Sequence, residues 1–411
     1  MSFLKRYPSF SLTEDEVKVK VADLLKDVSN HETSENFTSI FSMIDLTSLN
    51  SSNTFKTIEC FIDQLNGFSK TYPNYENVAA ICVYPPFVSQ IKDHLKPETG
   101  VKIASVAACF PSSQTYLEVK KKECELALLD GADELDIVIS LKFFLEKNYN
   151  KVLEEIKIIK NICGTKHLKV ILETGVLKTP TLIYEASLLA MEAGADFIKT
   201  STGKLEPAAT LEAVYVMCVA INEFKKINGG SVGLKAAGGI STGEEAMKYY
   251  VLVKKILGDA YLNKDLFRFG ASKLANEILT KIEGGAMVNY FGEKFPKDEI
   301  VEKKFTKEKN SKGEKENEKS SKMKENEKIK FEVTKKIRKN KFFEERKIKS
   351  TRIQNQKENK KIGEKAEKNE ISEQNEKSLE SEKKEKPNRI DKKRKNDTKI
   401  LLVNLKRNKK K

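Results

Sequence analysis

The feature that most constrains this chain is a regular alternation of short apolar runs with longer amphipathic runs. The short runs are rich in Val, Ile and Ala, which is typical of buried strands, and the longer runs have helical periodicity. Strands are predicted at 39–46, 78–84, 102–107, 134–139, 168–173, 196–200, 232–236 and 268–269. Helices are predicted at 54–70, directly after Pro85 and Pro86, and at 113–129, 150–162, 180–193, 208–225, 242–257 and 272–282.

Eight strand-helix units in about 250 residues predict an α/β fold of the closed (β/α)8 kind, the TIM barrel. An open doubly wound sheet is the alternative. Such a sheet usually carries a glycine-rich dinucleotide turn after its first strand, but the sequence IDLTSLN found there has no GxGxxG pattern. The barrel is therefore favoured, and the residues before it are expected to form an N-terminal helical cap.

Charge divides the chain into two unlike parts. Residues 301–411 contain 40 Lys or Arg and 21 Asp or Glu, whereas the 300 residues before them contain 35 and 39. The tail repeats Lys, Glu, Asn and Ser with few aromatic residues, so it cannot bury enough apolar surface to offset its ordering entropy. We expect a helical cap at 1–38, a barrel at 39–292 and a long disordered, low-complexity basic tail at 293–411.

The basic tail has two interpretations. Clusters of Lys and Arg at 392–395 and 405–411 are typical of an arm that binds nucleic acid or a membrane surface, or of a nuclear-import signal. The interspersed acidic residues and the lack of an aromatic stacking platform favour a solvated extension instead. Any nucleic-acid binding would therefore involve the tail alone. In that alternative interpretation, the barrel would serve only as a scaffold for the tail.

Cysteine spacing and apolar segment lengths indicate the compartment. The six cysteines are irregularly spaced, with no CxxC pair, and are interpreted as reduced thiols. The N-terminus is interrupted by charges and Pro8 before an apolar region forms, and no stretch approaches the ~18 apolar residues of a membrane-spanning helix. We expect a cytoplasmic protein without a membrane partner.

Two lysines lie inside predicted apolar strands, near the strand ends where barrels place their chemistry. Lys199 occurs in DFIKTSTGK and Lys235 in VGLKAAGG, on adjacent strands. Burial beside a second cation favours the neutral amine, which attacks a carbonyl to form a Schiff base. In the alternative, each is a structural lysine neutralised by Asp136 or Glu173. The presence of two on neighbouring strands favours function.

Glycine-containing loops follow the last three predicted strands. They are STGK at 201–204, AGGI at 237–240 and GASK at 270–273. Backbone N–H groups of such loops can approach an oxyanion, and the third loop opens onto a helix N-terminus. Because barrels frequently build phosphate sites there, we predict a phosphate site to which Lys204 adds positive charge.

The acid/base candidate is Asp136, which shares a strand face with Glu134. A carboxylate beside lysines can exchange protons, although its spacing equally allows a structural ion pair. Histidine is nearly excluded, because His31, His94 and His167 fall in the N-terminal segment, a helix and the base of a strand. No cluster of residues has metal-ligand spacing, so no metal site is predicted.

Seven motifs together resemble the deoxyribose-phosphate aldolase family over residues 39–282. In order, they are MIDLTSLN, AAICVYPPFV, GADELDIVI, LKVILETGVL, GADFIKTSTGK, GLKAAGGI and RFGAS. The resemblance implies a class I aldolase that reversibly cleaves 2-deoxy-D-ribose 5-phosphate to D-glyceraldehyde 3-phosphate and acetaldehyde, in deoxyribonucleotide catabolism. It also implies no cofactor or metal, a phosphorylated sugar as the substrate, and a homo-oligomer, either a dimer or a tetramer.

The same resemblance implies roles for individual residues. Lys199 would be the Schiff-base nucleophile, Lys235 the neighbour that lowers its pKa and helps transfer protons, and Asp136 a proton donor and acceptor. Substrate hydroxyls and phosphate would be held by Asp45, Thr47, Gly203, Lys204, Gly238, Gly239, Gly270 and Ser272. Two positions depart from the family pattern, since Ala236 replaces a usual proline and Lys273 replaces a usual serine.

Overall fold

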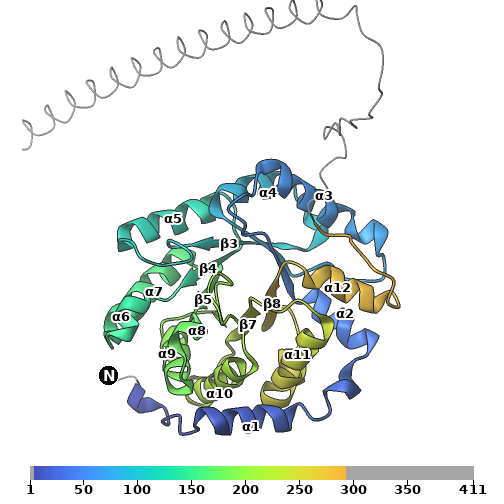
Figure 1. Cartoon of the computed structure of the whole chain (residues 1–411). Helices are drawn as coiled ribbons and strands as arrows, with labels where there is room; N and C mark the ends of the chain where they lie inside the picture. Colours follow the sequence, from blue (N-terminus) through green and yellow to red (C-terminus); the bar gives the residue numbers. More distant parts are fainter. Residues whose placement is uncertain (1–3, 293–411) are drawn as a thin grey trace, which may run out of the picture. The chain divides into compact units, whose positions relative to one another are not determined.

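The computed structural model describes residues 4–292, which form a closed barrel of eight parallel strands (Figure 1). The strands pair in sequence order, and the eighth closes on the first. They are β1 (Ile44–Thr47), β2 (Ala80–Val83), β3 (Lys102–Ala107), β4 (Glu134–Val138), β5 (His167–Ile171), β6 (Phe197–Lys199), β7 (Gly233–Ala237) and β8 (Phe267–Ala271). The barrel prediction is confirmed and the open sheet is wrong. The predicted tail lies outside the described residues.

Helices surround the strands, as Figure 1 shows. They are α3 (Phe55–Thr71), α4 (Val88–His94), α5 (Leu117–Leu129), α6 (Leu141–Leu145), α7 (Tyr149–Cys163), α8 (Thr174–Leu177), α9 (Pro180–Glu192), α10 (Leu211–Asn228), α11 (Gly243–Leu257) and α12 (Leu274–Ile282). Threonine fixes several of the starts: Thr54, Thr179, Thr210 and Thr242 each accept a hydrogen bond from a backbone N–H of the first helical turn. The short helices α6 and α8 were not predicted.

The segment before the barrel is helical, and its last helix runs further than expected. The helix α1 (Glu14–Leu24) packs against α10 and α11, whereas α2 (Ser34–Ser42) packs against α11 and α12 (Figure 1). The prediction of a strand from residue 39 is therefore wrong at its start. Phe37, Ile40 and Phe41 have helical spacing and form the buried face of α2, so the strand begins only at Ile44.

The two faces of the strands have different roles. Outward side chains such as Leu46, Ile81 and Leu135 belong to the main hydrophobic core, which also contains the buried faces of the helices. On the other face, β2 and β3 contribute a small apolar cluster made of Ala80, Cys82, Ala104 and Val106, with Leu49 packed against it. Strand register places this cluster level with Asp45 and Asp136, so one part of the interior is apolar and the rest is charged.

Gly233 allows β7 to pack closely against an aromatic ring of the neighbouring strand. A Cβ atom at this position would lie 2.3 Å from Cε1 of Phe197. We expect Gly233→Ala to lower the free energy of unfolding by about 1–3 kcal/mol, because the buried ring must shift in a packed interior. Urea unfolding followed by circular dichroism measures this change.

The matched control is Gly67→Ala, because Gly67 lies within α3 and its new Cβ atom would meet only Tyr290 Oη, at 3.4 Å. Alanine should stabilise this helix by about 0.5–1 kcal/mol. Equal unfolding midpoints for the two variants would contradict the packing argument.

Candidate active site

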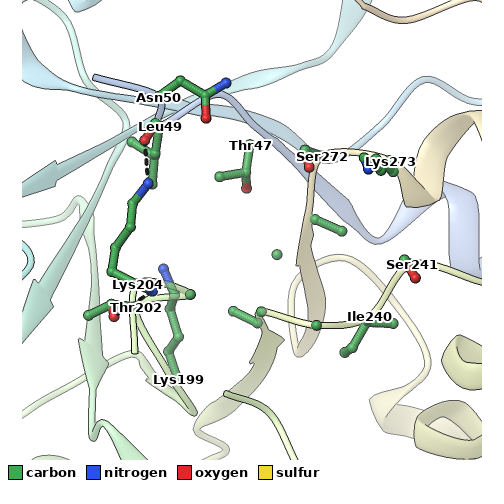
Figure 2. Close-up of a pocket in the computed structure, with 16 residues that line it drawn as sticks. Thr47, Leu49, Asn50, Lys199, Thr202, Lys204, Ile240, Ser241, Ser272 and Lys273 are labelled. Carbon is green, nitrogen blue, oxygen red and sulfur yellow. Dashed lines mark hydrogen bonds between the residues drawn. The ribbon is translucent and has the colours of Figure 1, made fainter. Parts of the chain in front are cut away.

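A pocket of about 290 Å³ opens at the carboxyl ends of β1, β6, β7 and β8 (Figure 2). It is lined by Thr47, Leu49, Asn50, Lys199, Thr202, Gly203, Lys204, Ala237, Gly238, Gly239, Ile240, Ser241, Gly270, Ala271, Ser272 and Lys273. Among these described lining residues, three are lysines and none is acidic. The pocket therefore favours an anionic ligand.

The lysines lie on different sides of this pocket. Figure 2 shows Lys204 and Lys199 on one side, with Ser272 and Lys273 across from them. Lys204 Nζ donates a hydrogen bond of 2.5 Å to the carbonyl of Leu49, which holds the side chain across the pocket wall. Ser272 and Lys273 are exposed at the start of α12.

The glycines of the two neighbouring loops permit a close backbone approach. Gly238 has φ of +87°, and a Cβ atom there would lie 2.7 Å from Ala208 Cβ and 3.0 Å from Gly203 Cα. Only glycine accommodates both the left-handed conformation and the contact. The loops after β6 and β7 therefore form one continuous wall of the pocket.

Six buried side chains form a closed ring of alternating charge in the barrel interior, and none of them lines the pocket. We call this the ionic ring, and its members in order are Asp45, Lys235, Asp136, Lys169, Glu134 and Arg268. Every member is at most 2% exposed. Three carboxylates alternate with three cations, so the ring has no net charge when all six are ionised.

The distances show how each cation bridges two carboxylates. Lys235 Nζ lies 2.5 Å from Asp45 Oδ2 and 2.8 Å from Asp136 Oδ2. Lys169 Nζ lies 3.0 Å from Asp136 Oδ1 and 2.5 Å from Glu134 Oε2.

Arg268 closes the ring, because Nη1 lies 2.6 Å from Asp45 Oδ1 and Nη2 lies 2.9 Å from Glu134 Oε1. All of these groups therefore have strong, charge-assisted hydrogen bonds in place of water.

These ion pairs keep the buried carboxylates charged. Burial alone would raise the pKa of Asp136, but Lys169 and Lys199 help to hold that pKa well below its usual value. Burial is likewise outweighed at Glu134, whose pKa is held well below its usual value, and at Asp45, whose pKa is lowered, because ring cations lie beside both. The carboxylates are therefore proton acceptors of low basicity that stay ionised at neutral pH.

Lys199 differs from the two ring lysines. Burial would lower the pKa of Lys169 and Lys235, but adjacent carboxylates raise both values overall. Lys199 Nζ lies 2.8 Å from Asp136 Oδ2, a carboxylate that already serves both ring lysines. Burial lowers the pKa of Lys199 and the nearby Lys235 lowers it further, which outweighs Asp136. Lys199 is thus the interior lysine best suited to provide a neutral, nucleophilic amine.

The structure places the predicted site residues in two layers at one end of the barrel. Those that line the pocket are Thr47, Lys199, Gly203, Lys204, Gly238, Gly239, Gly270 and Ser272. Asp45, Asp136 and Lys235 lie instead in the ionic ring. Glu173, considered as a neutralising partner for the lysines, accepts hydrogen bonds from the backbone N–H and the hydroxyl of Thr202.

Three members of the ring were not among the predicted site residues, namely Glu134, Lys169 and Arg268. A usable signal was present for Arg268. It lies two residues before Gly270 in a strand, so alternation places both on the interior face, where an arginine requires carboxylate partners.

Known proteins resemble this chain over its barrel. Residues 39–274 match the family model described as DeoC/LacD family aldolase. The chain belongs to this aldolase family. Deoxyribose-phosphate aldolase of Mus musculus is 41% identical over 249 residues, covering 58% of this chain and 78% of that relative. Deoxyribose-phosphate aldolase of Homo sapiens is 40% identical over 253 residues, with the same coverage of 58% and 78%.

A solved structure from Toxoplasma gondii ME49 has a TM-score of 0.54 and 24% sequence identity, and it covers 62% of this chain and 98% of that chain. At this identity the likeness supports the barrel fold alone. Within residues 4–292, no group of three or more His, Cys, Asp or Glu side chains is arranged to hold a metal ion. No helix in the described part of this aldolase is long and apolar enough to cross a membrane.

Asp136 is the carboxylate on which the buried lysines of this aldolase depend. We expect Asp136→Asn to lower the free energy of unfolding by about 3–5 kcal/mol near neutral pH, because an amide cannot offset the ammonium groups around it. The difference from wild type should narrow below about pH 4, where the unfolded Asp binds a proton but the folded one resists it. Urea unfolding at several pH values measures this.

The control for this prediction is Asp259→Asn. Asp259 pairs with Lys254 at 3.2 Å, but its side chain is 78% exposed. Its removal should cost less than about 1 kcal/mol. A similar loss in both variants would contradict the special role of the buried carboxylate.

Proposed function

We propose that this protein is a class I aldolase that reversibly cleaves 2-deoxy-D-ribose 5-phosphate to D-glyceraldehyde 3-phosphate and acetaldehyde, in deoxyribonucleotide catabolism. The observation that carries the proposal is Lys199, a buried lysine of lowered pKa that lines a pocket whose charged side chains are all cationic. The names of the mouse and human relatives support the substrate. The alternative, a barrel that only carries a nucleic-acid-binding or membrane-binding tail, is not favoured.

In this proposal the neutral Nζ of Lys199 attacks the aldehyde carbon C1 of the open-chain sugar. The resulting carbinolamine loses water to give an imine, and this requires a proton at the departing oxygen. Asp136, 2.8 Å from Nζ, and Lys235, bound to the same carboxylate oxygen, are the groups placed to pass protons there. Asp136 contacts the reacting nitrogen directly, and Lys235 contacts Asp136.

Cleavage then uses the imine as an electron sink. Asp136 accepts the proton of the C3 hydroxyl, the C2–C3 bond breaks, and the electron pair of that bond moves toward the imine nitrogen to form an enamine. D-Glyceraldehyde 3-phosphate is the first product. Protonation of the enamine at C2 restores an imine, and water releases acetaldehyde and the free lysine. The reverse sequence forms the carbon-carbon bond.

The phosphate is the part of the substrate that the remaining pocket residues would hold. Lys204 and Lys273 supply positive charge, and the loop containing Gly238 and Gly239 supplies backbone N–H groups beside Ser272. Binding energy at the phosphate positions the aldehyde carbon near Lys199. A non-phosphorylated sugar should therefore react much more slowly.

Four further expectations accompany this proposal and rest on the sequence. The protein is proposed to act in the cytoplasm and to assemble as a dimer or a tetramer. The domain limits at 38 and 292 remain predictions, as does the restriction of any nucleic-acid binding to the tail. Size-exclusion chromatography with light scattering of the full chain determines the assembly.

The nucleophile can be tested by borohydride trapping. Wild-type protein incubated with 2-deoxyribose 5-phosphate and reduced should carry a two-carbon adduct on the peptide that contains Lys199, located by mass spectrometry. Lys199→Met keeps a long unbranched side chain but has no attacking amine, so its adduct should be absent. Folded wild-type protein without an adduct would overturn the proposed reaction.

Lys273 offers a test of the phosphate site, since this chain has a lysine where the family usually has a serine. We expect Lys273→Ser to raise KM for 2-deoxyribose 5-phosphate by about 2- to 5-fold, as for an exposed charge pair of about 0.4–1 kcal/mol. The kcat/KM for non-phosphorylated 2-deoxyribose is the internal control and should not change. An equal effect on both sugars would show that the side chain does not act on the phosphate.

A further inference from the structure

The charge balance of the barrel interior singles out one lysine. The ionic ring is complete without Lys199, because Lys235 and Arg268 each bridge two of its three carboxylates and Lys169 lies within ion-pair distance of all three. Lys199 is a fourth interior cation, joined to the ring only through Asp136. If Lys199 and the six ring members were all ionised, this set of seven groups would hold one positive charge in excess. Removal of one proton from Lys199 makes the summed charge of these seven groups zero.

We propose that Arg268 and Glu134 are positioning residues that determine the proton affinity of Lys199 by fixing this charge balance. The inference rests on the proposed function, in which Lys199 must react as a neutral amine. Arg268 and Glu134 are 2% and 1% exposed and are absent from the pocket lining, so neither can touch the substrate. Their influence must pass through the ring.

Two routes connect these residues to Lys199. Arg268 binds Asp45, which binds Lys235, which shares an oxygen of Asp136 with Lys199. Glu134 binds Lys169, which binds the other oxygen of Asp136. Both routes therefore end at Asp136, the carboxylate that Lys199 contacts. A change of charge at Arg268 or at Glu134 alters how strongly Asp136 favours the protonated form of Lys199.

The other titratable groups around Lys199 do not supply this balance. Cys82 of β2 is fully buried, and its raised pKa keeps it a neutral thiol. The β3 residues of the interior cluster are Ala104 and Val106, which carry no charge. Above the ring, Glu173 accepts a hydrogen bond from the hydroxyl of Thr202 and Lys204 donates one to the carbonyl of Leu49, and the side chains of Glu173 and Lys204 have opposite formal charges, so together they add no net charge.

Below the ring, His167 of β5 approaches Glu134, with Nδ1 3.4 Å from Oε1. The side chain of His167 is 40% exposed, whereas that of Glu134 is 2% exposed. The permanent charges of Arg268 and Glu134 therefore set the balance near neutrality.

The test uses two substitutions of similar size and opposite charge effect. Glu134→Gln removes a negative charge, so Lys199 should lose its proton more readily. Arg268→Gln removes a positive charge, so the three carboxylates face only the three lysines, and Lys199 should keep its proton to balance them. Trapping of Lys199 should decrease at acid pH as its amine becomes protonated, and we call this part of the pH profile the acid limb. The acid limb should move to lower pH in Glu134→Gln and to higher pH in Arg268→Gln.

The probe is acetaldehyde, which has no titrating group, with cyanoborohydride trapping of the Lys199 peptide measured across pH. We expect shifts of about 0.5–1 pH unit in opposite directions, smaller than the ~1–3 units caused by a directly adjacent charge. Arg268→Lys keeps the charge and should leave the limb in place. The double variant Glu134→Gln with Arg268→Gln restores the balance and should return the limb toward that of wild type.

The outcomes separate this inference from the proposed function. No acetaldehyde adduct in wild type would overturn the proposed function itself. A normal adduct in wild type, with both single variants unshifted or shifted in the same direction, would overturn the inference, because loss of a structural contact has no reason to move the limb in opposite directions. If Arg268→Gln does not fold by circular dichroism, Glu134→Gln and Arg268→Lys decide: only a downward shift in the former with no shift in the latter supports the inference.

Discussion

The structure depends on burying seven ionisable groups away from solvent, and Asp136 contacts three of them. Its two oxygens contact the ammonium groups of Lys169, Lys199 and Lys235, which come from three consecutive strands. Isolated charges in such a place would carry a large desolvation cost, whereas an alternating ring gives every charge an opposite neighbour. Because one carboxylate serves three lysines, the last of them is under-compensated. The same arrangement that stabilises the interior therefore leaves Lys199 with a lowered pKa.

The barrel fold converts this local chemistry into a site by separating two tasks. The ring is sealed between the strands, where its geometry is held by the register of the sheet, and the pocket is made by loops that follow four of those strands. Rigid strands keep the proton-exchanging groups at fixed distances, and glycine loops bring backbone N–H groups toward an anion. Lys199 is the only residue that belongs to both layers among those described here, since it lines the pocket and contacts Asp136.

Much of this could be predicted from the sequence, and the reasons for success and failure are physical. Strand-helix alternation and the position of Lys199 before a glycine loop are local features of the sequence. The barrel and the polar residues at its strand ends could therefore be predicted. The helix over 39–42 was missed because Ile40 and Phe41 suit either a strand or a helix, and only packing of α2 on α11 and α12 decides between them. The ring was missed because it joins β1 to β4 through Arg268 of β8, a closure that exists only in the folded barrel.

The two departures from the family pattern act at different levels. Ala236 lies within β7 and its methyl group is fully buried, so its replacement of proline affects the backbone after Lys235 and not the charges. Lys273 is exposed at the pocket, across from Lys204, and its positive charge lies outside the buried ionic ring. A second exposed cation strengthens the attraction for a dianionic phosphate while it leaves the buried proton balance intact, because solvent screens it from Lys199. Substrate recognition and amine reactivity can therefore change independently in this barrel.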